Sequence, residues 1–150
     1  MISKKTKYAF KAMFFLATKY TAAEPVLIAE IAKKELIPKK FLETILLELK
    51  KKGLLRSKKG KGGGYLLARS PEQISFGEVY DIFENPFALL PCLTAAPQAR
   101  CDECRSGSVC GIQIVMQEIY KVTTNVMNIT TLQEVRDRMG QSQQDVMYYI

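Results

Sequence analysis

Apolar side chains recur at helical spacing in the first third of the chain. Between residues 4 and 19, one helical face carries Tyr8, Ala9, Ala12, Met13, Phe15 and Leu16. The segment TAAEP ends this helix, because residues before a proline avoid helical angles. A second, shorter helix is predicted from Ile28 to Lys34, with an inward face of Ile28, Ile31 and Ala32.

The stretch from Ile37 to Tyr65 has the most specific pattern. Pro38 suits the first turn of a third helix, whose apolar face is Phe41, Leu42, Ile45, Leu46 and Leu49. Gly53 ends this helix, as glycines often do. Strands at Leu54-Leu55 and Tyr65-Leu66-Leu67 then flank a turn rich in lysine and glycine. A cationic helix followed by such a hairpin predicts a winged helix-turn-helix; the alternative is an amphipathic helix with a solvated loop.

The second half of the chain predicts further helices. Ser75 and Glu78 have capping-box spacing at the start of a fourth helix. A long helix from about Val109 to Ile129 places β-branched residues at heptad spacing, at Ile112, Val115, Ile119, Val122, Val126 and Ile129. This stripe predicts a seam between two chains, although it could instead pack on its own domain. A short last helix is predicted from Thr131 to Met139.

The predicted fold class is mainly α with a small β wing. We expect a winged helix-turn-helix DNA-binding domain at residues 1–84 and a cysteine-bearing loop at residues 85–111. A dimerisation helix and a short C-terminal helix follow at residues 112–140, and a tail at residues 141–150. The expected assembly is a homodimer.

Length and composition narrow the class of protein. The chain has 150 residues, of which 47% are hydrophobic and 25% charged, as in ordinary soluble globular proteins. No apolar run approaches the roughly 18 residues of a membrane span. The amino-terminal stretch is interrupted by Lys11 and Lys19 and lacks a leader cleavage site. We therefore expect a cytoplasmic protein with no membrane partner.

Charge is divided unevenly along the chain. Residues 1–70 contain 17 Lys and Arg against 5 Asp and Glu, a net charge of +12. Residues 71–150 contain 5 against 10, a net charge of −5. Clustered cations bind DNA by releasing its counterions. The first segment therefore predicts double-stranded DNA as the partner.

The four cysteines, Cys92, Cys101, Cys104 and Cys110, lie within 19 residues, and the chain has no histidine. In the expected reducing compartment, such thiols serve as metal ligands or redox groups more often than as structural disulfides. Thiolates suit iron–sulfur clusters and zinc. The spacing leaves three interpretations open: an iron–sulfur cluster, a four-thiolate zinc site, and a thiol switch between Cys101 and Cys104.

The sequence argues against an enzyme. It lacks histidine, and it has no strand–helix alternation that could hold a nucleotide-binding glycine fingerprint. The glycines at residues 60–64 lie among lysines and precede a strand, so they do not form a phosphate cradle at a helix.

The segments IPKKFLETILLELKKKGLLRS and GKGGGYLLARSPEQISFGEVY, with the cysteine loop before a long helix, resemble the Rrf2 family of bacterial transcription regulators. The resemblance covers about residues 1–140. It implies a homodimeric winged-helix protein that reads palindromic DNA. Several members hold an iron–sulfur cluster in this loop, among them a regulator of cluster assembly.

The resemblance implies roles for individual residues. Lys39 and Lys40 open the recognition helix where family members touch bases and phosphates. Glu43 matches a glutamate by which the cluster-assembly regulator discriminates between classes of site, and Lys59 matches its minor-groove arginine. The full candidate DNA-binding set is Lys39, Lys40, Glu43, Lys58, Lys59, Lys61 and Tyr65.

The resemblance also implies that the loop binds an iron–sulfur cluster. Family members commonly use three cysteines and a histidine or carboxylate, whereas this chain offers four cysteines. The resemblance leaves open which three match the common ligands: Cys92, Cys104 and Cys110 bracket the loop, and Cys101 is the candidate for the fourth ligand. A two-iron cluster is favoured over a four-iron one, and it is expected to be lost in air.

The predicted function is therefore transcription regulation that responds to iron, redox state or nitric oxide. The alternative is a cluster-free or zinc-binding repressor of the same type. Such a repressor would respond to thiol oxidation, to a small molecule or to a partner protein.

Overall fold

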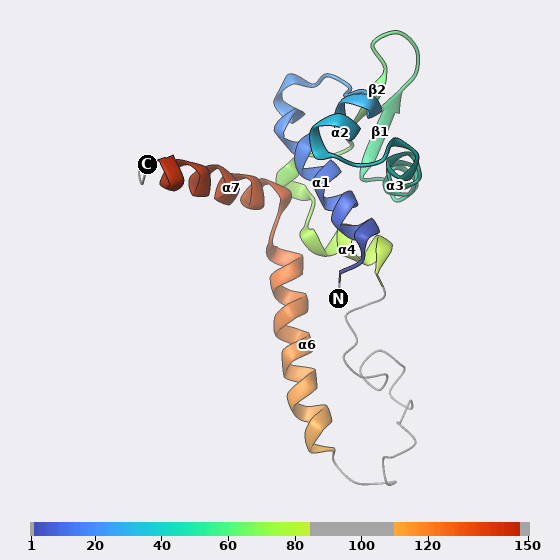
Figure 1. The fold of residues 1–150 in the computed structure, drawn as a ribbon. Coiled ribbons are helices and arrows are strands. Elements are labelled where there is room, and N and C mark those ends of the chain that lie inside the picture. Colours follow the sequence, from blue (N-terminus) through green and yellow to red (C-terminus); the bar gives the residue numbers. More distant parts are fainter. Residues whose placement is uncertain (1, 85–109, 148–150) are drawn as a thin grey trace.

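The computed structural model describes residues 2–84 and 110–147, of which residues 22 and 142–147 are described by their backbone alone. Its elements are α1 (Lys4–Thr18), η1 (Tyr20–Ala22), α2 (Ile28–Glu35), α3 (Lys39–Lys51), β1 (Leu55–Lys58), β2 (Gly64–Leu67), η2 (Pro71–Gln73), α4 (Phe76–Phe83), α6 (Gly111–Ile129) and α7 (Leu132–Met147). The helices α1 to α4 and the β1–β2 hairpin form one body (Figure 1). From this body α6 extends in one direction and α7 in another.

One hydrophobic core lies inside the body. The apolar faces of α1, α2 and α3 meet there, and the largest fully buried side chains include Met13, Leu16, Ile31, Leu42, Ile45, Leu46 and Leu49. These are positions that helical periodicity assigned to inward faces. Phe41 was assigned to the same face and that prediction is wrong, because its side chain is 57% exposed. It precedes Leu42 by a single residue and so turns about 100° away from it around the helix.

The turn between α2 and α3 is tight. Leu36 caps α2 in the left-handed conformation with φ 55°, and its side chain is 83% exposed. Ile37 follows and is buried, and Pro38 caps the start of α3. At the other end of α3, Gly53 adopts φ 78°, which confirms the predicted glycine stop. The helix-turn-helix is thus fixed at both ends of α3.

The wing is an antiparallel pair of strands in which Leu55 faces Leu67 and Lys58 faces Gly64. A third segment supports it: the Val26 N–H donates to the Tyr65 carbonyl and the Tyr65 N–H donates to the Val26 carbonyl, both at 2.8 Å. Gly64 lies so close to this segment that a Cβ there would be 2.3 Å from the Val26 carbonyl oxygen. The pairing ties the wing to the chain just before α2.

The predicted capping box at α4 is present. Ser75 Oγ accepts from the Glu78 N–H at 3.1 Å, and Glu78 Oε2 accepts from the Ser75 N–H at 3.0 Å. Beside it, the junction of α6 and α7 returns to the body: the Phe76 N–H donates to the Thr130 carbonyl at 2.7 Å, and the Leu132 N–H donates to the Ile74 carbonyl at 3.0 Å. Leu132 is fully buried in the core.

Helix α6 is accessible to solvent along its whole length, and none of its residues is buried in the single chain. The heptad residues named above are between 42% and 67% exposed. The alternative that this stripe packs on its own domain is therefore wrong for these residues. Met127, near the end of α6, packs against the core instead. Among the described residues, no helix is long and apolar enough to cross a membrane.

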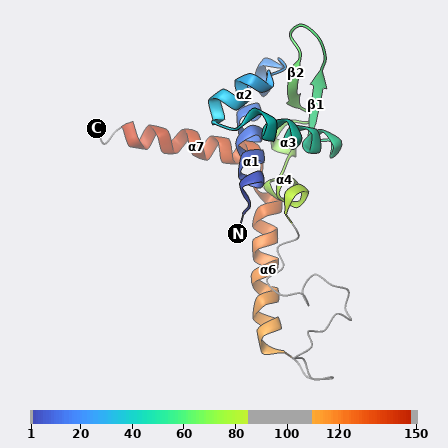
Figure 2. The ribbon, with the colours of Figure 1, turned by 45° about the vertical axis from the view of Figure 1, so that its right-hand side comes forward.

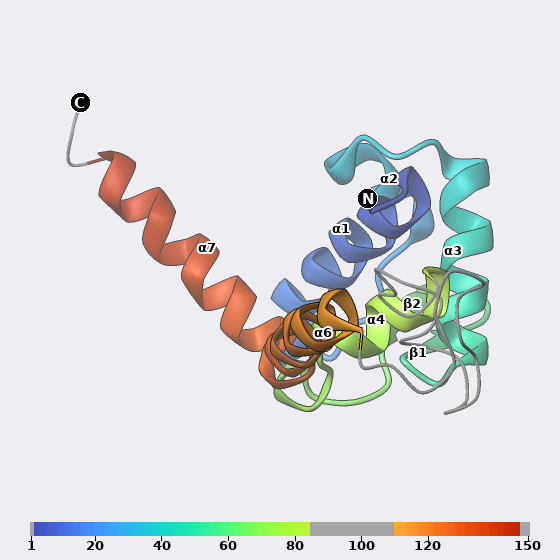
Figure 3. The same ribbon diagram turned by 90° about the horizontal axis from the view of Figure 1, so that it is seen from below.

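The last helix is longer than predicted. It runs to Met147 rather than ending near Met139, so residues 141–147 belong to α7 and not to a tail. The polar run after Gly140 contains no apolar period that could reveal a helix, yet glutamine is a good helix former. Arg136 Nη1 donates to the Ala17 carbonyl at 3.2 Å and so holds the base of α7 against α1. Figure 3 shows α7 leaving the body on the side opposite to α3.

Candidate nucleic-acid interface and cysteine segment

The exposed side of α3 is the first part of the candidate interface. Since the apolar face of α3 is buried, helical spacing places Lys40, Thr44, Leu47 and Lys51 on the opposite side of the helix. All four of these residues are exposed. Lys39 and Glu43, also exposed, flank them. The predicted residues of α3 therefore occupy one accessible surface.

The tip of the wing is the second part. Lys58 ends β1, and Lys59 and Lys61 lie in the turn before β2, all exposed. The wing stands beside α3, at the end of the molecule opposite to the Gly111 end of α6 (Figure 2). None of the lysines in the candidate set forms an ion pair within the described residues, whereas Lys5, Lys11 and Lys19 do. These unpaired cations fit a polyanion.

Tyr65 differs from the rest of the candidate set. Its side chain is half-buried and packs against the core, and its backbone forms both hydrogen bonds to Val26. The geometry gives it a structural role at the base of the wing. A contact with DNA through its ring stays a prediction.

Two exposed residues of the α3 surface, Thr44 and Leu47, are absent from the candidate set. Leu47 is 49% exposed, and the Thr44 hydroxyl makes no hydrogen bond within the described residues. Charge does not single out either residue, because both side chains are neutral. The helical positions opposite the predicted core residues would have identified both.

A polar network links α3 to the amino terminus of α1 and the end of α4. Lys5 Nζ lies 2.8 Å from Glu48 Oε1 on α3 and 5.3 Å from the centroid of the Phe83 ring. Glu84 Oε1 accepts from the Ser3 N–H at 2.8 Å and from the Thr6 hydroxyl. These bonds, led by the one from Thr6, hold the pKa of Glu84 below its ordinary value.

Of the four predicted ligands, the described residues include only Cys110; Cys92, Cys101 and Cys104 lie outside them. Cys110 is the residue before α6, is partly exposed, and makes no side-chain hydrogen bond to the helix. Within residues 2–84 and 110–147, no three histidine, cysteine or acidic residues gather as a metal site.

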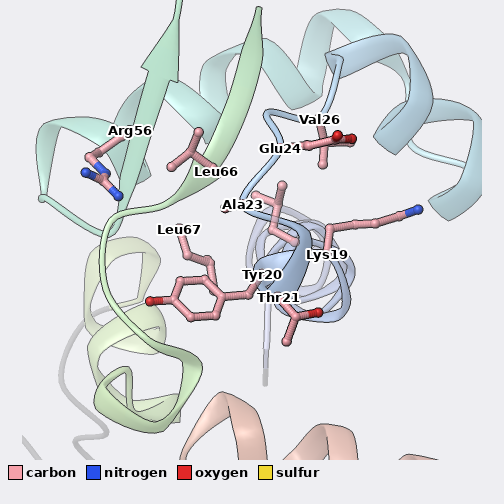
Figure 4. Close-up of a pocket in the computed structure, with 10 residues that line it drawn as sticks. Lys19, Tyr20, Thr21, Ala23, Glu24, Val26, Arg56, Leu66 and Leu67 are labelled. Carbon is pink, nitrogen blue, oxygen red and sulfur yellow. The ribbon is translucent and has the colours of Figure 1, made fainter.

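A cavity of ≈ 330 Å³ lies where the wing meets the end of α1 (Figure 4). Its apolar wall includes Leu16, Val26 and Leu67, all of which belong to the core. Lys19 and Arg56 line it on opposite sides, and the Lys19 ammonium group points away from it and pairs with Glu30. The combination of an apolar wall with a few polar groups is typical of small-molecule sites.

The sequence matches known proteins over most of its length. A model of the Rrf2 family, described as an iron-dependent transcriptional regulator, matches residues 2–138. The chain is 36% identical over 137 residues to an rrf2-like HTH-type transcriptional regulator of Rhodobacter capsulatus, with 90% of this chain and 91% of that protein covered. It is 31% identical over 134 residues to the HTH-type transcriptional regulator NsrR of Bacillus licheniformis, with 89% of this chain and 90% of that protein covered.

Solved structures agree with the fold. CymR, named the global cysteine regulator of B. subtilis, superposes with a TM-score of 0.76 at 24% identity, over 92% of this chain and 97% of that one. IscR of T. potens superposes with a TM-score of 0.74 at 25% identity, over 95% of this chain and 90% of that one. The predicted mainly α fold with a small β wing is confirmed. The chain belongs to the Rrf2 family, whose members are DNA-binding transcriptional regulators and not enzymes.

Proposed function

We propose that this chain is a homodimeric regulator that reads a palindromic operator and senses iron, redox state or nitric oxide. The sensing group is an iron–sulfur cluster, with two irons favoured over four, held by Cys92, Cys101, Cys104 and Cys110. One observation carries this proposal: a chain of an iron-dependent regulator family places four thiols within 19 residues and offers no histidine.

The proposed DNA contacts are made by α3 and the wing. Lys39, Lys40 and Glu43 would meet base edges and phosphates in the major groove, and Lys58, Lys59 and Lys61 the backbone or minor groove beside it. Their support is geometric: α3 and the wing share one end of the molecule, the residues are exposed, and the lysines among them have no carboxylate partner within the described residues. Such cations favour DNA binding because they release counterions condensed on the phosphates.

The proposed dimer is formed by α6. Six β-branched residues at heptad spacing are exposed along one stripe of a 19-residue helix. An isolated helix with no buried residue is marginal in water, so a partner surface is needed to stabilise it. A second copy of the same stripe satisfies this need, and two copies of α3 then match two half-sites.

The donor chemistry fits the proposed cluster. Thiolates are the protein ligands that iron–sulfur clusters use, and such a group would supply a redox-sensitive and oxygen-sensitive element. Cys110 stands directly before the amino terminus of α6. Relatives named NsrR and IscR occur among the matches. Glu84 and Cys110 flank the cysteine segment, so a cluster held there would be linked to α4 through one and to α6 through the other.

The test is reconstitution without oxygen. Wild type and the four single Cys→Ser variants are loaded with iron and sulfide, their visible spectra are recorded, and each is titrated against operator DNA. Loss of absorbance is expected for the variants at Cys92, Cys104 and Cys110, with a weakened spectrum for the variant at Cys101. The operator affinity of all four variants should shift toward that of the cluster-free protein. Wild-type spectra in the Cys92 and Cys110 variants would rule out the four-thiolate site.

A second candidate keeps the operator and dimer but replaces the signal. A zinc ion bound by the four thiols, or a disulfide between Cys101 and Cys104, would use the same cysteine segment as the cluster. Regulation by a partner protein would not require the cysteines. The cavity at the base of the wing specifically favours a small molecule as the signal, because it lies against the segment that positions the wing. Metal and sulfide analysis of protein purified without oxygen distinguishes a cluster, a zinc site and a metal-free protein.

A further inference from the structure

The exposed side of α3 has a spacing suited to base readout. Lys40, Glu43, Thr44 and Leu47 stand at positions i, i+3, i+4 and i+7, the spacing by which a homeodomain recognition helix reaches bases in the major groove. All four are exposed and lie on the side away from the core or at its edge. A helix docked in the groove by this side would bring these four side chains to base edges.

Leu47 is the unusual member of the four. It is 49% exposed and absent from the core, although the nearby Leu46 and Leu49 are fully buried. A single exposed leucine needs no explanation on a general protein surface. Here, however, the other exposed residues on the same side of α3 are polar or cationic. A large apolar side chain among polar and cationic residues on the exposed side of α3 fits a partner that is negatively charged and presents small apolar groups.

Duplex DNA has this combination in the major groove at thymine. The C5-methyl group of thymine is the one apolar feature that a base edge presents there. Phosphates on either side supply the negative charge that Lys40 and Lys51 would meet. Thr44 lies three residues before Leu47 on the helix, so the two side chains are neighbours on its surface, and the methyl group of Thr44 can add to the apolar surface of Leu47.

We propose that Leu47, together with the methyl group of Thr44, reads thymine C5-methyl groups in each half-site. The proposal rests on the proposed docking of α3 in the major groove. It adds a specificity that the charged residues lack, since lysine selects guanine acceptors and glutamate selects the cytosine amino group. Leu47 is the main reader and Thr44 supports it.

The experiment removes only the methyl group from the DNA. The preferred operator is selected from a random duplex pool with the full-length protein, and deoxyuridine then replaces each thymine in turn. Wild type is expected to lose about fourfold in affinity at one or two thymines of each half-site, the fold-change for burying about one CH₂ group. Leu47→Ala and Leu47→Gln should lose most of the preference for thymine over deoxyuridine at that position, and Thr44→Ser should reduce this preference by a smaller amount.

Phe41→Ala is the matched control, because Phe41 is an exposed apolar residue of the same helix outside the four positions named above. It should keep the preference for thymine. Equal wild-type affinity for thymine and deoxyuridine duplexes would overturn the inference and leave the proposed docking intact. So would a full thymine preference in both Leu47 variants with unchanged melting temperatures. Failure to select any sequence from the pool would overturn the proposed function itself.

Discussion

Lys5 in the first turn of α1 and Glu48 in the last turn of α3 form an ion pair, with 2.8 Å between Lys5 Nζ and Glu48 Oε1. The same ammonium group lies over the ring of Phe83 at the end of α4. One side chain thus joins the helix proposed to read DNA to the helix that precedes the cysteine segment.

Lys5→Met should lower the free energy of unfolding by about 0.5–1 kcal/mol, because the pair is partly exposed and the cation–π contact adds to it. A double-mutant cycle with Glu48→Gln, measured by urea denaturation, should show coupling between the two residues. Lys7→Met is the control, since Lys7 is exposed in the same turn and forms no ion pair within the described residues. Additive effects of the Lys5 and Glu48 changes would contradict the pairing.

Glu84 makes the stability of the folded body depend on pH. The Thr6 hydroxyl and then the Ser3 N–H hold the pKa of Glu84 below its ordinary value of 4.5. A depressed folded-state pKa stabilises the fold above the unfolded pKa, and this stability is lost as the pH falls through the folded pKa. Glu84→Gln should therefore be less stable than wild type at pH 7, and the difference should shrink below pH 4.5. Denaturation at several pH values measures this difference, with Glu72→Gln as a control at an exposed glutamate.

The α6 stripe predicts the effect of charge on assembly. Ile119→Lys and Val126→Lys should each convert the dimer to monomer in sedimentation, because burying an unpaired ammonium costs several kcal/mol. Each protomer should stay folded, since both side chains are exposed in the single chain. Met127→Lys is the matched control outside the stripe, and it should lower protomer stability because Met127 packs against the core. An unchanged dimer in both stripe variants would refute the seam.

The close approach at the wing predicts a sharp glycine requirement. In Gly64→Ala, the new Cβ would meet the Val26 carbonyl oxygen at 2.3 Å, and φ 153° adds strain. We expect a loss of about 2–4 kcal/mol in stability and weaker DNA binding, because the wing loses its support. Gly62→Ala, at φ 73° with nothing within 4 Å, should cost only about 1–2 kcal/mol. Thermal melting and DNA titration of both variants compare the two positions.

Lys40 and Lys59 should differ in how they affect DNA binding. Lys59→Ala should lower affinity for all sequences alike and reduce the salt slope by about one ion, as expected of a phosphate contact. Lys40→Ala should also change the preferred sequence, because Lys40 lies on the side of α3 opposite the core. Titrations at several salt concentrations with two operator sequences distinguish these effects. Wild-type affinity and slope in both variants would contradict the winged-helix docking.

The local elements were predictable because their signals lie close together in sequence. The Ser75–Glu78 capping box and the Gly53 stop each depend on residues within one helical turn, and both are present. The buried face of α3 followed from its period, apart from Phe41. The length of α7 could not be predicted from the sequence, because the part of this helix that leaves the body has no buried face and therefore no apolar period.

Contacts between distant segments were not predictable. The pairing of Val26 with Tyr65 and the bond from Thr6 to Glu84 join residues far apart in the chain, and nothing near either partner marks the other. The exposed cations of the candidate site were found from their charge, from the helix and hairpin pattern and from the family resemblance. Leu47 was not, because a leucine in an amphipathic helix looks like core until the burial of its neighbours is known.

Two backbone hydrogen bonds, from Phe76 to Thr130 and from Leu132 to Ile74, attach the junction of α6 and α7 to the body. A rotation at this junction would tilt α6 relative to the body. The 19 residues of this helix span about 28 Å. A tilt of about 10° at this junction would carry the far end of such a rod through roughly 5 Å. In the proposed dimer, where each α6 is held by its partner, a rotation at this junction would move each body and its α3. The half-site spacing that the dimer can read would therefore depend on this junction.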